Sequence, residues 1–384
     1  MMKLNKDKWE IVKFEKIVSN ISERVEPNNT NLDKYIGLEH LDSGNSKIKR
    51  FGTPKEVIGT KLKIYKGDII FGKRRAYQRK AAVVDFNAIC SAHSMVLRAN
   101  ENVIVKDYLL CFIHSDMFMN RAIEISEGSL SPTIKWKTLA KQEFPLPYIE
   151  EQKIIASLFK SIEITIEQLE LQEKNLKLLR KNLINKLSKK SFHFGNLIEK
   201  SKCKEFSIGE VANEIPDRTD NPSTSGFEKF VGLEDFESGE LNIQKYSSTE
   251  KLVSAMKLFK SGDILFARRN AYLKRASLVD FDGVCSGDAI VMRAIKTIIE
   301  PLYLVLIMNT DEFWDFAISN AAGTMSKRVK WRDLATYIFN LPDLNTQKNI
   351  LEIFQQLQTT QEQLKQQKTT LKTLKQKLLN EVLG

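Results

Sequence analysis

Two basic segments, each with a tyrosine near its centre, hold the residues whose types and spacing could do chemistry in this chain. The first contains Lys73, Arg74, Arg75, Tyr77, Arg79 and Lys80, and the second contains Arg268, Arg269, Asn270, Tyr272, Lys274 and Arg275. Arginine makes bidentate contacts to guanine and to phosphate, lysine supplies a point charge, and asparagine can pair with adenine. A basic hairpin can also be merely solvated, but this cluster occurs twice around the same tyrosine. We therefore predict that both segments contact DNA.

A second pair of segments places hydroxyl groups beside cations. The residues concerned are Ser129, Ser131 and Lys135 in the first copy and Thr324, Ser326, Lys327, Arg328 and Lys330 in the second. Hydroxyls, lysines and exposed backbone amides commonly position phosphates, so we expect these residues to contact DNA as well. Trp136 and Trp331 follow, and we expect them to anchor the loops in the core rather than to stack on bases. Arg75 stands where the other copy has Asn270, so the two copies could read different bases.

Catalytic chemistry finds little support in the sequence. Residues 67 to 74 come close to a Walker A loop, but Arg74 stands where a Mg²⁺-binding Ser or Thr is needed. The four histidines are scattered, and no nucleophile–base pair emerges. The four cysteines lack metal-ligand spacing, and we expect Cys90 and Cys285 to be buried as small hydrophobic side chains. We therefore predict no catalytic residues, no metal site and no cofactor.

These segments are positioned by a long internal repeat. Residues 35 to 187 recur as residues 230 to 382 at a constant offset of 195. The repeat divides the chain into a first module at 1–148, a helix at 149–190, a linker at 191–203, a second module at 204–342 and a second helix at 343–384. Each module is long enough to bury a core of its own.

The modules mix strand and helix signals, which predicts an α+β fold. The short apolar runs at 68–71, 81–84 and 94–97 are expected to be strands, because turn residues bound them. One helix is expected from Lys106 to about Ile125, and residues 302–308 are expected to form a buried helix segment. Pro145 and Pro147 exclude both helix and central strand, so they end the first module.

The two long helices carry a heptad pattern with Ile or Leu at every a position, from Ile155 and from Ile350 onward. The assigned d positions include Thr165, Gln172, Thr360 and Gln367, at the same layers in both copies. Polar residues in a helix seam select register and partner, so we predict an antiparallel coiled coil with an approximate twofold axis. At about 1.5 Å per residue the rod spans roughly 55 Å, or about 15 base pairs of DNA. The alternative is that each helix lies on its own module.

The composition agrees with a nucleic-acid partner. The formal net charge is +11 and the pI is near 9.2, which suits a polyanion. The hydrophobic content of 42% with 28% charged residues is typical of a folded soluble protein. We find no signal-peptide pattern and no apolar run long enough to span a membrane, so we expect a cytoplasmic protein without a membrane partner.

The order and duplication of these motifs resemble the specificity subunit (S subunit) of type I restriction-modification systems. The motifs are Gly37-Leu38-Glu39 and Gly232-Leu233-Glu234, the two basic segments, the two tryptophan segments, and Glu151-Gln152-Lys153 and Thr346-Gln347-Lys348 at the helix starts. The resemblance covers nearly the whole chain. The chain ends with the second helix, which leaves open whether its terminal segments form a clasp.

The resemblance implies that each module is a target-recognition domain and that the helices set the spacing between two half-sites in double-stranded DNA. It further implies a prokaryotic, DNA-associated protein on which two modification (methyltransferase) subunits dock, joined by restriction subunits in the full complex. The specificity subunit itself would be non-catalytic. The competing hypotheses are a nuclease or methyltransferase with an atypical site, and a basic structural adaptor protein.

Overall fold

The computed structural model describes residues 6–189, 192–196, 198, 203–324 and 326–383. It consists of two compact units: unit 1 contains Met1–Glu170 and Gln366–Gly384, and unit 2 contains Leu171–Lys365. Each unit therefore holds one module together with one end of each long helix. The expected linker at 191–203 lies partly outside the described residues, at 191, 197 and 199–202. Its described residues Phe192, Phe194 and Ile198 are buried in the core of unit 2.

The module of unit 1 is built on three small sheets. Their strand orders are β2-β9-β6-β7, β3-β5-β8-β4 and β1-β10. The strands are β1 (Glu10–Lys13), β2 (Val18–Ile21), β3 (Arg24–Val25), β4 (Tyr35–Ile36), β5 (Lys61–Ile64), β6 (Ile69–Gly72), β7 (Ala81–Val83), β8 (Ala88–Cys90), β9 (Ser94–Ala99) and β10 (Glu143–Leu146). The pairing of β4 with β8 is parallel, and the other pairings are antiparallel. The predicted strands at 68–71, 81–84 and 94–97 are confirmed as β6, β7 and β9.

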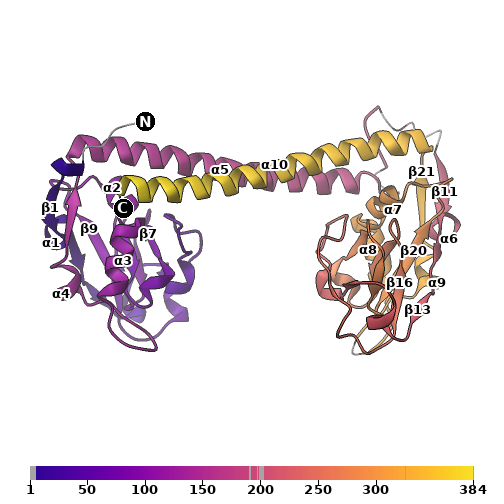
Figure 1. Cartoon of the computed structure of the whole chain (residues 1–384), viewed down its shortest axis with the longest axis horizontal. Helices are drawn as coiled ribbons and strands as arrows, with labels where there is room; N and C mark the ends of the chain where they lie inside the picture. Colours follow the sequence, from indigo (N-terminus) through magenta and orange to yellow (C-terminus); the bar gives the residue numbers. More distant parts are fainter. Residues whose placement is uncertain (1–5, 190–191, 197, 199–202, 325, 384) are drawn as a thin grey trace. The chain divides into compact units, whose positions relative to one another are not determined.

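The helices of unit 1 correct one prediction. They are α1 (Phe14–Ile17), α2 (Lys106–His114), α3 (Asp116–Glu124), α4 (Trp136–Leu139) and the first half of α5 (Ile149–Asn185). The single helix predicted from Lys106 to Ile125 is wrong, because Ser115 divides it into α2 and α3 (Figure 1). The Ser115 hydroxyl donates to Phe112 O and accepts from Phe118 N, so it ends one helix and caps the next.

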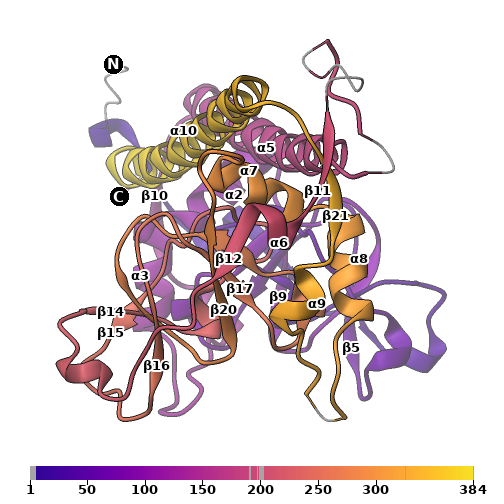
Figure 2. The same ribbon diagram turned by 90° about the vertical axis from the view of Figure 1, so that its right-hand side faces the viewer.

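Unit 2 repeats this architecture. Its strands are β11 (Lys204–Ser207), β12 (Ala212–Glu214), β13 (Arg218–Thr219), β14 (Lys229–Val231), β15 (Ser247–Ser248), β16 (Met256–Phe259), β17 (Ile264–Ala267), β18 (Ala276–Leu278), β19 (Gly283–Cys285), β20 (Ala289–Ala294) and β21 (Ile338–Leu341). Its sheets are β12-β20-β17-β18, β13-β16-β19-β14-β15 and β11-β21, and the last pair runs side by side in Figure 2.

The helices of unit 2 are α6 (Ile208–Val211), α7 (Pro301–Met308), α8 (Asp311–Ser319), α9 (Trp331–Leu334) and the first half of α10 (Leu344–Leu383). The predicted buried helix at 302–308 is confirmed, because every side chain of α7 from Tyr303 to Met308 is buried. Thr310 caps α8 as Ser115 caps α3, by accepting a hydrogen bond from Phe313 N. The two modules thus share the same helix break.

One glutamine fixes the start of each long helix on its module. Gln152 of α5 accepts a hydrogen bond from Val105 N and donates to Val103 O and Pro147 O. Gln347 of α10 makes the same contacts to the equivalent positions of unit 2. Both side chains are fully buried, and the three hydrogen bonds satisfy backbone groups at the end of the module. The Gln-Lys motif found in the sequence is therefore a docking element.

Each unit also packs the far end of the other helix into its core. In unit 1, Leu379 near the end of α10 belongs to the same buried cluster as Ile155 and Phe159 of α5. In unit 2, Ile184 near the end of α5 belongs to the same buried cluster as Ile350 and Phe354 of α10. The two triplets occupy equivalent positions of the repeat. Apolar burial, which contributes about 25 cal/mol per Å² of buried surface, therefore stabilises the packing of the helix ends in both units.

The predicted polar seam layers are wrong. Thr165, Gln172, Thr360 and Gln367 are all exposed. Thr165 and Thr360 donate their hydroxyls to carbonyls four residues earlier in their own helices. The Ile and Leu series lies on the buried stripe, but the second buried row runs through Phe159, Ile166 and Arg180, one position beyond the assigned d series. The assigned d series and the observed buried series both lie three or four residues from the Ile and Leu series. Periodicity alone therefore could not choose between these two series.

Candidate nucleic-acid interface

The first basic segment of each copy forms a tight loop between two strands, which we name the hairpin loop (residues 73–80 between β6 and β7, and 268–275 between β17 and β18). Arg75, Arg79, Asn270 and Lys274 have φ between 50° and 57°, and they are the only non-glycine residues with positive φ in the described part of the chain. This left-handed conformation costs roughly 1–2 kcal/mol for a residue such as Arg or Lys. Strain of this kind, repeated at matched positions, is typical of a functional site.

An ion pair holds the C-terminal part of each hairpin loop. Arg79 forms a salt bridge with Asp116 at the start of α3. Lys274 lies 2.8 Å from Asp311 at the start of α8. Hydrogen bonds from Lys274 and then Asn185 lower the pKa of Asp311, so this carboxylate is ionised at neutral pH. Arg79 and Lys274 therefore anchor the loops to their own modules and position the rest of each loop.

The last cation of each hairpin loop has a similar role. Lys80 Nζ donates to Leu38 O at 2.7 Å, and Arg275 Nη1 donates to Leu233 O at 2.6 Å. The Gly-Leu-Glu motif found in the sequence thus supplies the carbonyl that receives the loop. Just before these anchors in the chain, Tyr77 and Tyr272 remain 54% and 66% exposed. The anchors therefore present an exposed aromatic ring on each module.

The second basic segment lies against the hairpin loop in each unit, and we name it the hydroxyl loop (residues 128–135 and 323–330). In unit 1, Arg74 Nη2 and Arg75 Nε donate to Ser131 Oγ at 3.1 and 3.3 Å. In unit 2, Arg269 Nε donates to Ser326 Oγ at 2.7 Å. The structure therefore brings the two predicted segments together in both copies.

Backbone contacts make the same junction rigid. Arg75 N donates to Pro132 O at 2.7 Å, and Asn270 N donates to Lys327 O at 3.2 Å. Lys135 pairs with Glu127 within its own loop. The other predicted residues of the hydroxyl loops, Ser129, Thr324, Lys327 and Lys330, are exposed. Trp136 and Trp331 are partly buried and pack against the module cores, as expected.

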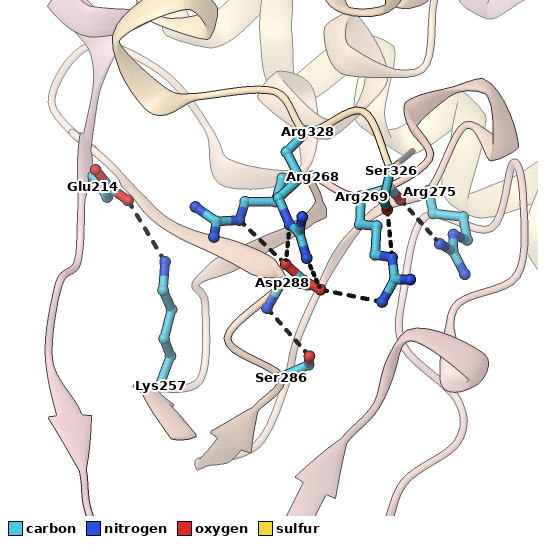
Figure 3. A network of polar contacts seen from close by, with 9 residues as sticks. All are labelled: Glu214, Lys257, Arg268, Arg269, Arg275, Ser286, Asp288, Ser326 and Arg328. Carbon is cyan, nitrogen blue, oxygen red and sulfur yellow. Dashed lines mark hydrogen bonds and ion pairs between the residues drawn. The ribbon is translucent and has the colours of Figure 1, made fainter. Parts of the chain in front are cut away.

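One equivalent position carries different chemistry in the two units. Asp288, between β19 and β20, accepts hydrogen bonds from Arg328 at 2.8 and 3.3 Å (Figure 3). Arg269 and Arg268 approach the same carboxylate to 3.6 and 3.7 Å. The hydrogen bond from Arg328 is the main cause that lowers the pKa of Asp288. The second module thus has an ionised carboxylate among three guanidinium groups.

The first module has His93 at this position. Its Nε2 lies 3.4 Å from Nη1 of Arg74. Burial lowers the pKa of His93, and the neighbouring charges of Arg74 and Lys73 lower it further. The imidazole is therefore neutral at pH 7, because its pKa lies below the ordinary value of 6.5.

Unit 1 also has a concave surface of about 720 Å³ beside its loops. Its charged lining residues are all cations: Arg24, Lys61, Lys73, Lys135 and Lys137. Burial lowers the pKa of Lys73. Sequence reasoning missed Arg24, Lys61 and Lys137, because they lie in three separate segments that only the fold brings together. Such a surface attracts phosphate groups.

The described residues contain no cluster of three or more His, Cys, Asp or Glu side chains that could hold a metal ion. Cys90 and Cys285 are buried in β8 and β19, as predicted, and burial raises the pKa of each thiol to about 12. A thiol with such a pKa is not a nucleophile at neutral pH. Within the same described part of the chain, every helix is too short or too polar to cross a membrane.

Two repeated α+β modules, each carrying two rigidly joined basic loops and docked to long helices, define a duplicated DNA-recognition protein. The chain belongs to the family described as type I restriction modification DNA specificity domain, whose pattern matches residues 6–178 and 200–373. It is a type I restriction-modification specificity subunit with two target-recognition domains, and such subunits recognise DNA without catalysing a reaction.

Curated relatives agree with this membership. The chain is 23% identical over 324 residues to the type I restriction enzyme EcoDI specificity subunit of Escherichia coli, covering 74% of this chain and 66% of that protein. It is 23% identical over 368 residues to the EcoKI specificity subunit of Escherichia coli strain K12, covering 85% and 76%. The matched regions thus leave part of each relative unmatched.

Solved structures share the fold. A chain from a structure on complex assembly and conformational transition of the type I R-M system matches with a TM-score of 0.63 and 20% identity, covering 97% of this chain and 96% of that one. The HsdS subunit from Thermoanaerobacter tengcongensis matches with a TM-score of 0.52 and 20% identity, covering 98% and 96%. The S subunit from M. genitalium matches with a TM-score of 0.54 and 13% identity, covering 100% and 98%.

Proposed function

We propose that this chain reads a bipartite target in double-stranded DNA, with one module on each half-site, in a type I restriction-modification complex. The observation that carries the proposal is the junction of hairpin loop and hydroxyl loop, which recurs at the same positions of both modules. Two modification (methyltransferase) subunits would dock on the chain, and restriction subunits would join them. We assign the complex to the cytoplasm of a prokaryote.

The two loops divide the work of recognition. Arg79 and Lys274 hold the hairpin loops through acidic partners, so their main contribution is to orient neighbouring residues. Lys73, Ser129, Lys135, Thr324, Lys327 and Lys330 would contact phosphates, which fix register but carry no sequence information. Arg74, Arg75, Tyr77, Arg269, Asn270 and Tyr272 would face base edges in the major groove, where each base pair is distinguishable.

The two half-sites would differ in sequence. Arg75 suits guanine or phosphate, whereas Asn270 at the same position suits adenine. His93 and Asp288 differ in charge at neutral pH. Gln78 is replaced by Leu273, which could contact only apolar groups such as the methyl group of thymine.

The long helices would form an antiparallel coiled coil with pseudo-twofold symmetry. Lys375 of α10 contacts Glu163 within unit 1, and Arg180 of α5 contacts Glu240 and Gly239 O within unit 2. Lys375 and Arg180 are equivalent positions of the repeat, so the end of each helix makes an ion pair from the same position, with α5 in unit 1 and with the module in unit 2. This arrangement favours the domain limits 1–148, 149–190, 191–203, 204–342 and 343–384. The rod would set a spacer of about 15 base pairs.

Selection from random duplexes tests the proposal. The full chain, alone and with modification subunits, is incubated with a random library, and bound DNA is sequenced. We expect two enriched half-sites of unlike sequence at constant spacing. Affinity should fall steeply with salt, because each neutralised phosphate releases counterions. Enrichment of no paired half-sites, with modification subunits present, would overturn the proposal.

The same assay separates the other hypotheses. Binding to an acidic protein that salt does not weaken, with no preference among DNA sequences, would favour a structural adaptor. Methyl-donor binding by the isolated chain would favour a methyltransferase with an atypical site.

A further inference from the structure

Asp288 is an unexpected residue for a surface that binds DNA. Its carboxylate lies between the hairpin loop and the hydroxyl loop of unit 2, where a negative charge repels phosphates (Figure 3). Only 19% of the side chain is exposed. A carboxylate in this place weakens the general attraction for DNA, so it must contribute something other than affinity.

Hydrogen bonds of its own backbone N–H and C=O groups fix the position of Asp288. Asp288 N donates to Ser286 Oγ at 3.2 Å, and Arg268 N donates to Asp288 O at 3.0 Å. These bonds attach the turn between β19 and β20 to the end of β17. The backbone of Asp288 is therefore held by its own turn and by Arg268, the first residue of the hairpin loop, directly after β17.

From this fixed point Asp288 orients arginines from both loops. Arg328 of the hydroxyl loop binds it through Nε at 2.8 Å and Nη2 at 3.3 Å. Arg269 of the hairpin loop approaches it through Nη1 at 3.6 Å and donates Nε to Ser326 Oγ at 2.7 Å. The planar guanidinium fork has five N–H donors in fixed geometry, so holding one edge fixes the direction of the donors that remain.

A guanidinium fixed in this way suits one base in particular. Guanine presents two acceptors, O6 and N7, on its major-groove edge, and a bidentate arginine contact to them is the commonest specific contact to DNA. An arginine with free rotation can instead contact any phosphate. Fixing the fork therefore favours base reading over phosphate contact.

The first module has no such carboxylate at this position. His93 replaces it and is neutral at pH 7, and it lies 3.4 Å from a single guanidinium nitrogen of Arg74. Arg74 and Arg75 instead share the hydroxyl of Ser131. A neutral partner orients a guanidinium less strongly than a carboxylate does.

We propose that Asp288 is a specificity-determining positioning residue, which orients Arg328 and Arg269 to read guanine in the half-site bound by the second module. This inference rests on the proposed function and deepens it. It names a base, and it assigns that base to one module.

Asp288→Asn in the full chain tests the inference, because asparagine keeps the shape but removes the charge. We expect the guanine preference at the second half-site to fall by roughly 10- to 100-fold, the range of one bidentate base contact. Affinity for random-sequence DNA should rise by a few fold, because a repelling charge is removed. The first half-site should keep its preference. A purely structural role of Asp288 would instead lower specific and random binding together.

Three further variants separate a change in base preference from a general loss of folding. Arg328→Gln should lower the guanine preference and also lower affinity for random DNA. The double variant D288N/R328Q should lose more guanine preference than R328Q alone but less than the sum of the two single losses, because the two changes share the Arg328 contact and only D288N also frees Arg269. Asp315→Asn, at an exposed carboxylate of α8, is the matched charge control and should leave the base preference unchanged.

The outcomes distinguish a failure of the proposed function from a failure of the role assigned to Asp288. Enrichment of no paired half-sites by the unaltered chain, with modification subunits present, would overturn the proposed function. Enriched half-sites with an unchanged guanine preference in D288N would overturn only the role of Asp288. A parallel fall of specific and random binding would also overturn it. The reciprocal His93→Asp should sharpen base preference at the first half-site and lower its affinity for random DNA.

Discussion

The ammonium group of Lys375 lies 2.6 Å from Oε1 of Glu163, although 212 residues separate the two in the chain. Ser46 donates its hydroxyl to the same oxygen at 2.5 Å. The two charged side chains are only 15% and 22% exposed. Burial would raise the pKa of Glu163, but the charge of Lys375 and the two hydrogen bonds outweigh it and lower the pKa. Within unit 1, this pair therefore attaches the end of α10 to α5.

Lys375→Met should destabilise unit 1 by about 2–3 kcal/mol, because it leaves a largely buried carboxylate without its partner. The free energy of unfolding in urea measures this loss. Lys372→Met is the matched control, since Lys372 makes an exposed pair with Glu170 at 3.3 Å and should cost less than about 1 kcal/mol. The double variant K375M/E163Q should recover much of the loss. Equal losses for K375M and K372M would contradict the prediction.

The stability of unit 1 should fall in mild acid. His114 is fully buried; burial, and next the charge of Lys375, lower its pKa to about 4, whereas an unfolded histidine has a pKa near 6.5. Between these values the unfolded chain binds a proton that the folded chain excludes. His114 therefore does not lower the free energy of unfolding above pH 6.5. As the pH falls to 4, it lowers the free energy of unfolding by at most about 3 kcal/mol. Glu163 adds to this loss, because its lowered pKa makes the folded state resist protonation.

His114→Asn is the variant that tests this pH dependence, because unit 2 has Asn309 at the equivalent position. The Asn309 amide donates to Ala276 O and Val305 O, so the site accepts an amide. Urea unfolding of H114N at pH 7 and pH 5 should show a smaller difference between the two pH values than the unaltered chain shows. An unchanged difference would mean that His114 does not carry the effect.

Much of the fold could be predicted from the repeat and from apolar periodicity. The runs that became β6, β7 and β9 were bounded by turn residues, and residues 302–308 were apolar throughout. The break at Ser115 was missed, because its cap depends on the hydroxyl reaching Phe118 N rather than on any gap in the apolar pattern. The second buried row of the long helices was assigned to Thr165 instead of Ile166, because both fit a heptad.

The segments that form the site could be predicted from the sequence, but the contacts that each of their side chains makes could not. Clustered cations identified both hairpin loops, and hydroxyl groups identified the loops that contact them. The sequence could not show that Arg79 is directed to Asp116, since an ion pair 37 residues apart leaves no local pattern. Asp288 was visible only as a replacement of His93, because its three arginines come from segments 268–269 and 328.

The exposed tyrosines should act on separate half-sites. Tyr77→Ala should weaken binding to the first half-site roughly 10-fold, the effect of losing an aromatic contact of about 1–2 kcal/mol, and Tyr272→Ala should do so at the second. Both rings are more than half exposed, so the melting temperature should change little. Binding to duplexes altered in one half-site at a time measures the effect. Equal losses at both half-sites in either variant would contradict the prediction.

Arg75 allows backbone strain to be separated from recognition. Arg75→Gly and Arg75→Ala both remove the guanidinium, so both should weaken binding to the first half-site equally. Glycine tolerates the φ of 57° and alanine does not, so the glycine variant should be more stable by about 1 kcal/mol. Thermal unfolding and duplex binding of the two variants measure these effects. Equal stabilities of the two variants would show that the alanine variant has left the left-handed conformation, and would contradict the prediction.

The length of the helices should set the spacing of the half-sites. Insertion of seven residues after Glu170 in α5 and after Lys365 in α10, where the two units meet in the chain, keeps the heptad stripe in phase. At about 1.5 Å per residue the insertions lengthen the rod by roughly 10 Å, so the spacer should grow by about 3 base pairs. The half-site sequences should not change, because the loops are untouched. Insertion into α5 alone is the control and should destabilise the chain, since only one of the two helices shared by the units is then lengthened. An unaltered spacer in the double insertion would show that the helices do not measure the distance.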